Sequence, residues 1–333
     1  MSGISRMPKP QIRDMLQVVV VDDAVKEKFP PGSTVVSAEA HGASFWTQTA
    51  RIEIEWPDKT RHCYFMKVAT GDVGKGMLRG EFHGVSALHK HVPEGIPRAV
   101  GWGTYRSDPD THFYLCDFVD MIEELPDVGK FCAMLAKLHH DSMNSPDAAD
   151  SFGFDVVTYE GRMYQDVTWS KSWEESYKLQ MQAFAEQERE SQGPSEELDE
   201  LLPILMDKII PRLLRPLQTH GRQIKPVLIH GDIWYGNLAI NAENGEPLFF
   251  DPSVIWGHNE LDLGNMGTPR YRMGRHWMQE YHKHFPISAP EEDYEDRNVV
   301  YAMHGHLCAS TLYPGNDNFR KMSVYTRLLV GVS

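Results

Sequence analysis

The first part of the chain alternates short apolar runs with turn residues, a pattern that predicts β-strands. Three such runs cover residues 34–40, 51–56 and 61–68, and the turn-like segment Pro57-Asp58-Lys59 separates the last two. Successive strands joined by short turns favour an antiparallel sheet. Two later strand-like runs, AVGWGTY and THFYLCDFV, extend the same region.

A helix is predicted between the third strand and these later runs, because apolar residues recur there at helical spacing. The spacing runs through Leu78, Phe82, Val85 and Leu88, and the pattern ends before Pro93 and Pro97. The preceding segment GDVGKG, residues 71–76, lacks the spacing and the terminal Ser or Thr of a P-loop. It is interpreted as a flexible loop.

Helical periodicity dominates from Pro126 onwards. Val128, Phe131, Cys132, Leu135 and Leu138 form one apolar stripe. Further helices are expected at residues 172–192 and 196–217, the latter interrupted by Pro203 and Pro211, with short strands at 227–229, 238–240 and 248–250 and helices at the C-terminus. The sequence therefore predicts an α+β chain with two lobes: an antiparallel-sheet lobe over residues 1–120, a connection at 116–120, and a larger, mainly helical lobe over 121–333.

Composition limits the partners. A chain of 333 residues with 41% hydrophobic residues can build two cores. A formal net charge of −14 argues against nucleic acid as a partner, since phosphate binding needs basic patches. The four cysteines are scattered, which favours a reducing cytoplasm. The N-terminal segment MSGISRMPKP leads into an apolar stretch too short for a membrane span and without a cleavage pattern, so neither export nor a membrane anchor is expected.

The segment VLIHGDIWYGNLAINAENGEPLFFDPS carries the most informative chemistry. Asp232 and Asn237 lie five positions apart, and Asp251 follows the next strand-like runs. Protein kinases use a loop Asp to accept the hydroxyl proton, an Asn at this offset to hold metal, and a later Asp to bind the Mg²⁺ that bridges the phosphates. Asp and Asn are also common turn formers, so the pair alone would fit a plain turn. The order of strand, loop, strand and Asp favours phosphoryl transfer from ATP with Mg²⁺.

Such a site also needs a strand lysine for the phosphates and a helix glutamate to pair with it. Lys67 lies in the apolar strand YFMKVA, and Glu81 lies in the following helix. A lone lysine is usually a solvated surface residue, so burial of Lys67 requires a partner such as Glu81.

Two further segments are candidates for contacts with ATP. The turn AHGASFW, residues 40–46, lies between the first two strands; Gly42 would permit close approach of the phosphates and Ser44 could donate a hydrogen bond, although a plain hairpin turn explains the segment nearly as well. Where the lobes join, backbone groups of Asp117 and Val119 could bind the adenine edge, or simply connect the lobes.

The run HGDIWYGN, residues 230–237, followed by FFDPSVIWGHNELDLGNM, resembles the fructosamine kinase (ketosamine 3-kinase) family, a branch of the aminoglycoside phosphotransferase-like kinases. The Trp that follows HGD and the Gly-His that follows the later Asp distinguish this branch from generic antibiotic and choline kinases. The resemblance spans roughly residues 34–315 and implies a protein-kinase-like fold.

By this resemblance Asp232 is the catalytic base, Asn237 and Asp251 bind the metal, and Lys67 with Glu81 binds the phosphates of ATP. The family phosphorylates the 3-hydroxyl of a ketose joined to an amine, including glycated lysines on proteins, and the phosphorylated adduct then releases the amine. Residues expected to face the sugar are Trp234 and Tyr235, with Trp169, Trp173 and His258 as weaker candidates. Aromatic core packing is the alternative for all of these residues.

Some positions depart from the family pattern. Gly42-Ala43-Ser44 replaces a run of glycines, and no cysteine occurs in this turn to support a disulfide-linked dimer, so a monomer or weak dimer is expected. Tyr235 replaces a smaller residue, which bears on acceptor specificity. Two alternatives remain open: an aminoglycoside or other amino-compound kinase on the same scaffold, and a catalytically inactive kinase-like binding module. The intact set of Lys67, Glu81, Asp232, Asn237 and Asp251 argues against the inactive module.

Overall fold

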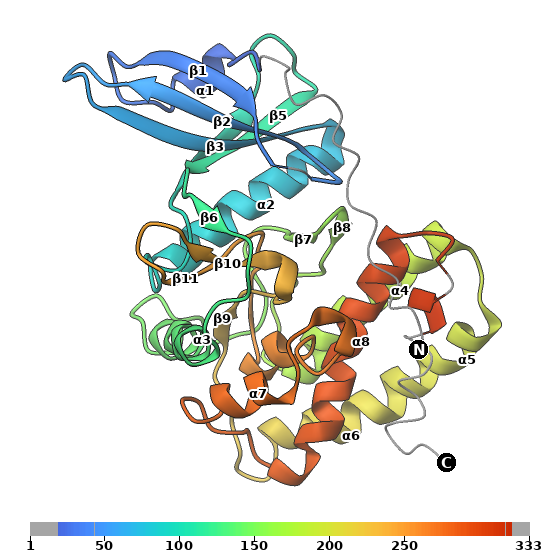
Figure 1. Ribbon diagram of the computed structural model, residues 1–333. Coiled ribbons are helices and arrows are strands. Elements are labelled where there is room, and N and C mark those ends of the chain that lie inside the picture. Colours follow the sequence, from blue (N-terminus) through green and yellow to red (C-terminus); the bar gives the residue numbers. More distant parts are fainter. Residues whose placement is uncertain (1–18, 43, 317, 322–333) are drawn as a thin grey trace, which may run out of the picture.

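The computed structural model describes residues 19–42, 44–316 and 318–321. A twisted sheet with one long helix lies above a larger, mainly helical part (Figure 1). The upper part contains α1 (Asp23–Lys26), β1 (Thr34–Ala40), β2 (Gln48–Glu55), β3 (Arg61–Thr70), α2 (Gly71–His89), β4 (Ala99–Thr104) and β5 (Thr111–Asp117). We call it the sheet lobe and the remainder the helical lobe. The predicted two-lobed α+β architecture is confirmed, whereas its boundary at residues 116–120 stays a prediction.

The sheet lobe is built on five antiparallel strands in the order β1-β2-β3-β5-β4. Alternate residues of β2 point into its core, where Ala50, Ile52 and Ile54 are buried. This period of two explains why an apolar and polar alternation in the sequence forms a half-buried strand. Lys67 lies on β3 opposite Thr49 and Tyr114, so the flanking strands fix its position.

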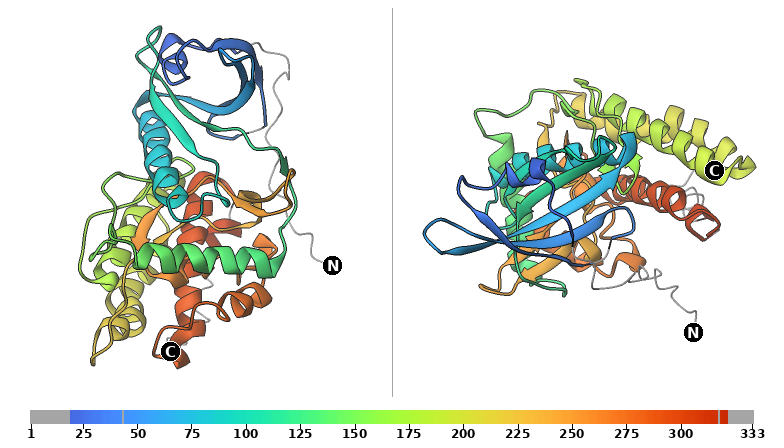
Figure 2. Two further views of the ribbon diagram at one scale, coloured as in Figure 1. Left: turned by 90° about the vertical axis from the view of Figure 1, so that its left-hand side faces the viewer. Right: turned by 90° about the horizontal axis from the view of Figure 1, so that it is seen from above.

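Helix α2 begins at Gly71, so the interpretation of residues 71–76 as a loop is wrong. Glycine normally weakens a helix, but here three glycines at intervals of four form a face without side chains. A Cβ at Gly76 would lie 2.3 Å from the Tyr159 hydroxyl, one at Gly80 2.6 Å from the Val157 carbonyl, and one at Gly84 2.9 Å from Val254. The glycines are therefore explained by close packing of α2 on the helical lobe, and Figure 2 shows α2 between the sheet and that lobe.

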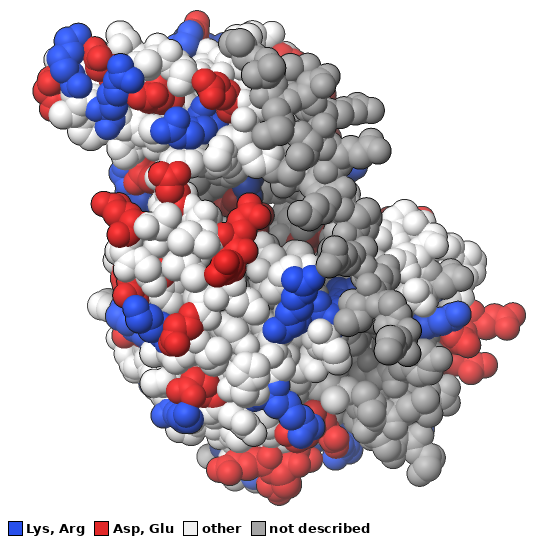
Figure 3. Space-filling view, in the orientation of Figure 1, with Lys and Arg blue, Asp and Glu red and all other residues white. Residues whose placement is uncertain are grey.

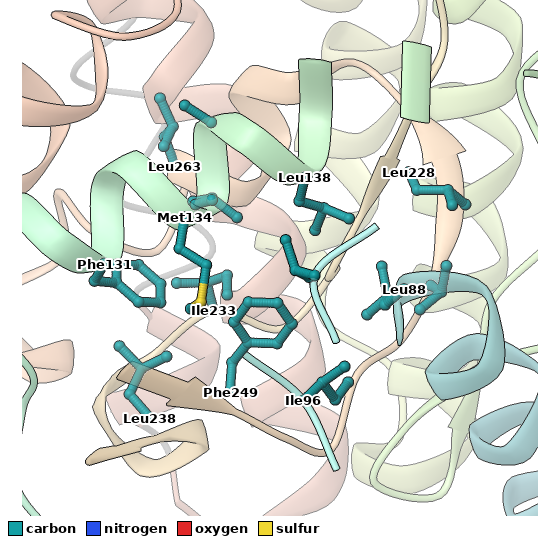
Figure 4. Packing of buried hydrophobic residues seen from close by; sticks show 14 of the residues in the cluster. Leu88, Ile96, Phe131, Met134, Leu138, Leu228, Ile233, Leu238, Phe249 and Leu263 are labelled. Carbon is teal, nitrogen blue, oxygen red and sulfur yellow. The ribbon is translucent and has the colours of Figure 1, made fainter. Parts of the chain in front are cut away.

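The helical lobe begins with short strands around α3. Its first part comprises β6 (Met121–Ile122), α3 (Val128–Met143), β7 (Tyr159–Glu160), β8 (Met163–Tyr164), β9 (Val227–Ile229), β10 (Leu238–Asn241), β11 (Pro247–Phe249) and β12 (Ile255–Gly257). The strands form three small sheets, β11-β10-β6, β12-β9 and β7-β8. The apolar stripe of α3 packs on them, and Figure 4 shows Phe131, Met134 and Leu138 facing Phe249 and Ile233. Burying each such side chain contributes about 1.5–3 kcal/mol.

The remaining helices are α4 (Trp173–Gln192), α5 (Glu196–Ile204), α6 (Ile210–Leu214), α7 (Arg275–Tyr281) and α8 (Tyr294–Leu312). The predicted helix at 196–217 is divided as its prolines indicated, because a π-helical turn at Leu205–Ile209 separates α5 from α6. Helix α8 is buried along most of its length and packs against α4.

Surface and termini add two observations. On the face in Figure 3, Lys and Arg are interspersed with Asp and Glu. No helix within the described ranges is long and apolar enough to cross a membrane. The N-terminal segment MSGISRMPKP lies outside the described residues.

Candidate active site

The loop that carries Asp232 begins where β9 ends. The backbone N–H groups of His230 and Gly231 donate hydrogen bonds of 2.8 and 2.7 Å to the two carboxylate oxygens of Asp262. Gly231 has φ +85°, and a Cβ there would lie 2.1 Å from the carbonyl oxygen of Ser253. Only glycine fits this turn, so Gly231 and Asp262 together fix the backbone just before Asp232.

Asp262 belongs to a fully buried polar network beneath the loop. Its Oδ2 lies 3.1 Å from Nε2 of His139, and Nδ1 of His139 lies 2.7 Å from the hydroxyl of Tyr281. Asn259 donates a 3.0 Å hydrogen bond to the same hydroxyl. No sequence motif assigned a role to Asp262. The one signal in the sequence was the acidic run NELDLGN after the Gly-His motif.

Asp232 itself is partly buried and faces Asn237. The Nδ2 of Asn237 donates to the Asp232 carboxylate at 2.8 Å and to its backbone carbonyl at 3.0 Å. Burial, followed by the negative charge of Glu160, raises the pKa of Asp232 well above its usual range, against the hydrogen bond from Asn237. Burial and the Glu160 charge therefore strengthen Asp232 as a base relative to an exposed carboxylate, whereas its hydrogen bond from Asn237 favours the charged form.

Asp251 follows β11 and faces the sheet lobe. It has φ +55°, uncommon for a residue with a side chain, and its carboxylate lies 2.5 Å from Nζ of Lys67. Lys67 also donates to Glu81 at 2.7 Å. The structure thus brings together a strand lysine, a helix glutamate and an aspartate from the other lobe, as the sequence pattern predicts for a phosphate and metal site.

The charges in this trio are strongly coupled. Burial alone would lower the pKa of Lys67, but the carboxylates of Asp251 and Glu81 raise it above its ordinary value, so the ammonium stays charged. Burial and the neighbouring Asp251 charge raise the pKa of Glu81 to about 7, while Lys67 opposes the shift. One lysine therefore balances two carboxylates, which leaves the trio acidic and suited to a cation.

The donor set fits a hard divalent cation. Asn237 uses its amide nitrogen for Asp232, which leaves its amide oxygen for a metal, and the Asp251 side chain is 48% exposed. Mg²⁺ is typically held by one or two protein oxygens together with substrate phosphates and water. Among the residues that the structure describes, no group of three or more His, Cys, Asp and Glu could hold a metal.

The turn between β1 and β2 reaches the helical lobe. Gly42 has φ +74°, and Oγ of Ser44 accepts hydrogen bonds from the backbone of Trp46 and Thr47 at 3.2 Å. Phe45 makes an edge contact, 5.9 Å between ring centroids, with Tyr313 at the end of α8. The turn is therefore ordered by its own serine and touches the helical lobe.

At the lobe junction the two predicted adenine contacts differ. The N–H of Asp117 donates to the carbonyl of Arg98 at 2.9 Å, and its carboxylate pairs with Arg98 and His62. Val119 is half-buried.

The aromatic residues predicted to face the sugar fall into two groups. Trp234 and Tyr235 follow Asp232 directly, with ring centroids 4.9 Å apart, and Trp234 also meets Tyr271 at 6.1 Å. The guanidinium of Arg272 lies 4.5 Å above the Tyr235 ring. Trp234 and Tyr235 are only partly buried and can contact an acceptor beside Asp232.

The other three candidates lie elsewhere. Trp173 is fully buried, and its indole N–H donates to Tyr301 at 2.7 Å. His258 is 1% exposed and bonds to Tyr301 and Ser288, so packing in the helical lobe accounts for both residues. Trp169 is 41% exposed and donates to Asp155 at 3.1 Å.

A strand lysine pairs with a helix glutamate, and from the other lobe these residues meet a loop that carries Asp and Asn and a further Asp of the kind that binds metal. This combination defines an ATP-dependent phosphotransferase with a protein-kinase-like fold. The particular branch follows from sequence. The chain matches the profile of the fructosamine kinase family over residues 33–330 and belongs to that family.

Individual relatives agree with this assignment. A chloroplastic protein-ribulosamine 3-kinase of Arabidopsis thaliana is 24% identical over 80% of this chain and 77% of its own. A ketosamine-3-kinase of Mus musculus is 40% identical over 61% of this chain and 69% of its own. A crystal structure assigned as a fructosamine-3-kinase from Haemophilus somnus superposes with a TM-score of 0.69 at 18% identity, covering 90% of this chain and 92% of that one. At that identity the superposition shows the shared fold alone.

Proposed function

We propose that this enzyme transfers the γ-phosphoryl group of ATP to the 3-hydroxyl of ketosamines, either free or on glycated protein lysines. The observation that carries the proposal is the meeting of Asp232, Asn237 and Asp251 with the Lys67–Glu81 pair in a member of the fructosamine kinase family. The relatives named ketosamine-3-kinase and protein-ribulosamine 3-kinase support this choice of acceptor.

Each residue has a distinct role in this proposal. Asp232 accepts the proton of the attacking hydroxyl, and Asn237 orients its carboxylate. Lys67 binds the α- and β-phosphates, and Glu81 holds the lysine in place. The oxygens of Asn237 and Asp251 would hold Mg²⁺, which neutralises phosphate charge when it is bound.

The surrounding residues complete the two substrate sites. Gly42 and Ser44 cover the phosphates, and backbone groups at Asp117 and Val119 bind adenine. Trp234 and Tyr235 contact the sugar, and Trp169 is retained as an outer candidate because it is exposed. Phosphorylation at O3 destabilises the adduct, so the amine is released. A cytoplasmic location and a monomeric or weakly dimeric state stay predictions.

A substrate panel tests the function. The protein with ATP and Mg²⁺ is incubated separately with a ribulosamine, a fructosamine and an aminoglycoside, and phosphorylated product is measured by mass, with Asp232→Asn as the background. We expect product from at least one ketosamine. Product from the aminoglycoside alone would replace the proposal with the antibiotic-kinase alternative, and no product from any acceptor would favour the inactive module.

A further inference from the structure

Residues 157–165, which include the β7–β8 hairpin, lie against both elements that carry the carboxylates around Lys67. One element is α2, below which Figure 1 shows the hairpin, and the other is the segment 251–254 after β11. Nζ of Lys67 spans the two carboxylates, 2.7 Å from Glu81 and 2.5 Å from Asp251. A structure that fixes the separation of these two elements therefore fixes the geometry of the trio.

The contact with α2 is made through the backbone. Gly80 directly precedes Glu81, and a Cβ at Gly80 would lie 2.6 Å from the carbonyl oxygen of Val157 and 3.2 Å from Cα of Thr158. Because no side chain separates the two backbones, α2 cannot move closer to the hairpin. The position of Glu81 relative to Thr158 is therefore set by the residue next to it.

The contact with the segment after Asp251 is made through hydrogen bonds. Nε2 of Gln165 donates to the carbonyl of Ser253 at 2.8 Å and also meets the hydroxyl of Ser253. Oγ1 of Thr158 donates to the carbonyl of Val254 at 3.1 Å. Two side chains therefore hold the chain two and three residues after Asp251.

Gln165 and Thr158 are themselves held in place. Each is 1% exposed. The N–H of Gln165 donates to the carbonyl of Thr158 at 2.9 Å, and Nε2 of Gln165 lies 3.3 Å from Oγ1 of Thr158. A buried amide with acceptors on this side has one favourable orientation, so the direction in which Gln165 donates is fixed.

The backbone at Asp251 requires such support. Its φ of +55° lies in the left-handed region, which costs free energy and persists where the surrounding structure holds it. The Asp251 side chain is 48% exposed, so packing around the carboxylate supplies little of this support. Ser253 is held from two sides instead: its N–H donates to the carbonyl of His230 at 2.8 Å, and its carbonyl accepts from Gln165.

We infer that Gln165, together with Thr158, is a positioning residue that holds Asp251 at the distance from Glu81 at which Lys67 and Mg²⁺ can both be bound. The inference rests on the metal role given to Asp251 in the proposed function. It gives residues outside both the HGDIWYGN loop and the metal ligands a part in binding Mg²⁺ with ATP.

Loss of the Gln165 amide should therefore weaken the binding that depends on the metal. Removing a residue that orients a metal ligand typically lowers metal affinity 10- to 100-fold. Gln165→Leu keeps the approximate size of the side chain but removes the donor to the Ser253 carbonyl. Asp251 then loses a restraint on its backbone, while Lys67 and Glu81 remain in place.

The test measures ATP binding by calorimetry, once with Mg²⁺ and once with EDTA, and without any acceptor. The quantity compared is the ratio of the Kd for ATP in EDTA to the Kd in Mg²⁺. We expect Gln165→Leu to lower this ratio roughly 10- to 100-fold. Thr158→Val removes a longer hydrogen bond and should lower the ratio by a smaller factor, whereas Thr158→Ser keeps the hydroxyl and should retain the ratio.

Gln187→Leu is the matched control. Gln187 on α4 holds the same hairpin, because its Nε2 donates to the Tyr164 carbonyl at 2.9 Å and its Oε1 accepts from the Tyr164 N–H at 3.1 Å. A general loosening of the hairpin would appear in this variant as well, and we expect its ratio to equal that of the wild-type protein. Because calorimetry fits the Kd apart from the fraction of protein that binds, partial unfolding does not imitate the effect.

Each outcome decides the inference. If Gln165→Leu does not fold, the comparison of Thr158→Val with Thr158→Ser replaces it. An unchanged ratio in the folded variants overturns the inference alone, and so does an equal loss in Gln187→Leu. A wild-type protein whose ATP affinity does not depend on Mg²⁺ overturns the metal assignment in the proposed function as well.

Discussion

Buried polar groups on the nucleotide side of the site have partners within the protein, whereas, within the ranges that the structure describes, several on the acceptor side do not. On the nucleotide side, Lys67 reaches both Glu81 and Asp251, so every charge has a partner before any ligand binds. On the acceptor side, His304 and His306 of α8 have buried ring nitrogens without hydrogen bonds among the described residues. The first arrangement stabilises the fold, whereas the second costs stability that a ligand can return.

This difference separates the positioning of ATP on one side from the selection of the acceptor on the other. A complete network holds its members rigidly, as suits the phosphates of one invariable co-substrate. An incomplete network discriminates, because a ligand without the matching group leaves the buried atoms unpaired. The following variants test the contrast, in order of decreasing expected effect.

Asp232→Asn removes the proton acceptor while keeping the shape of the side chain. We expect kcat to fall by roughly 10²–10⁴-fold, because general base catalysis contributes about that much. The affinity for ATP, measured by calorimetry, should change little since Asp232 acts on the acceptor. Turnover at the wild-type rate would contradict the assignment of Asp232 as base.

Asp262→Asn tests the support beneath the loop. The buried carboxylate accepts from two backbone N–H groups and lies against His139, and an amide can replace only one of its oxygens. We expect the free energy of unfolding to fall by about 2–4 kcal/mol. Denaturant titration measures this, with exposed Asp147→Asn as the control. Equal free energies of unfolding for the two variants would show that the buried network does not contribute to stability.

Lys67→Met breaks the nucleotide side selectively. It should weaken ATP binding roughly 10- to 100-fold, the range for a lost charged hydrogen bond. Lys59→Met is a matched control, because Lys59 and Glu55 are also 2.7 Å apart but Lys59 is 79% exposed. That variant should bind ATP normally. Similar losses of ATP affinity in both variants would mean that the buried Lys67–Glu81 pair has no specific role in binding ATP.

His306→Phe tests the cost of the unpaired acceptor side. Burial, followed by the nearby Arg270, lowers the pKa of His306 to about 4. Between pH 6.5 and 4 the unfolded state therefore binds a proton that the folded state excludes, and stability is lost as the pH falls through this window. The variant should lose less stability there, by at most about 3 kcal/mol.

The measurement is the free energy of unfolding at pH 7 and pH 4.5. His258, whose pKa burial likewise lowers to about 4, remains in the variant, so part of the pH dependence should persist. If the wild-type protein and the variant lose the same free energy of unfolding between pH 7 and pH 4.5, the burial of His306 does not cause that loss.

Local pattern predicted much of this molecule from its sequence. The alternation in β2 and the apolar stripe in α3 predicted both elements, although β2 begins at Gln48 and α3 continues to Met143. The spacing of Asp232 from Asn237 indicated a site because both residues lie on one short loop. Lys67 and Glu81 could be paired because a known chemistry requires both residues.

The remainder depends on contacts between distant segments. Asp262 binds the loop of Asp232 from 31 positions away, and Glu160 meets α8 across more than a hundred residues, so no local spacing reveals either. The glycines of residues 71–76 favoured a loop, because the neighbours that make them necessary in α2 were not visible. Trp173 and His258 could not be separated from surface aromatics without knowledge of burial.

The glycine face of α2 also limits how the two lobes can be exchanged between proteins. Gly76, Gly80 and Gly84 touch Tyr159, Val157 and Val254 without any side chain that could adjust to a changed partner. A chimaera joined near residue 120 would combine one protein's helix with another protein's hairpin. The two lobes of the chimaera would pack together only if the incoming helix has glycine at all three positions. These three positions therefore limit which proteins can exchange lobes by recombination.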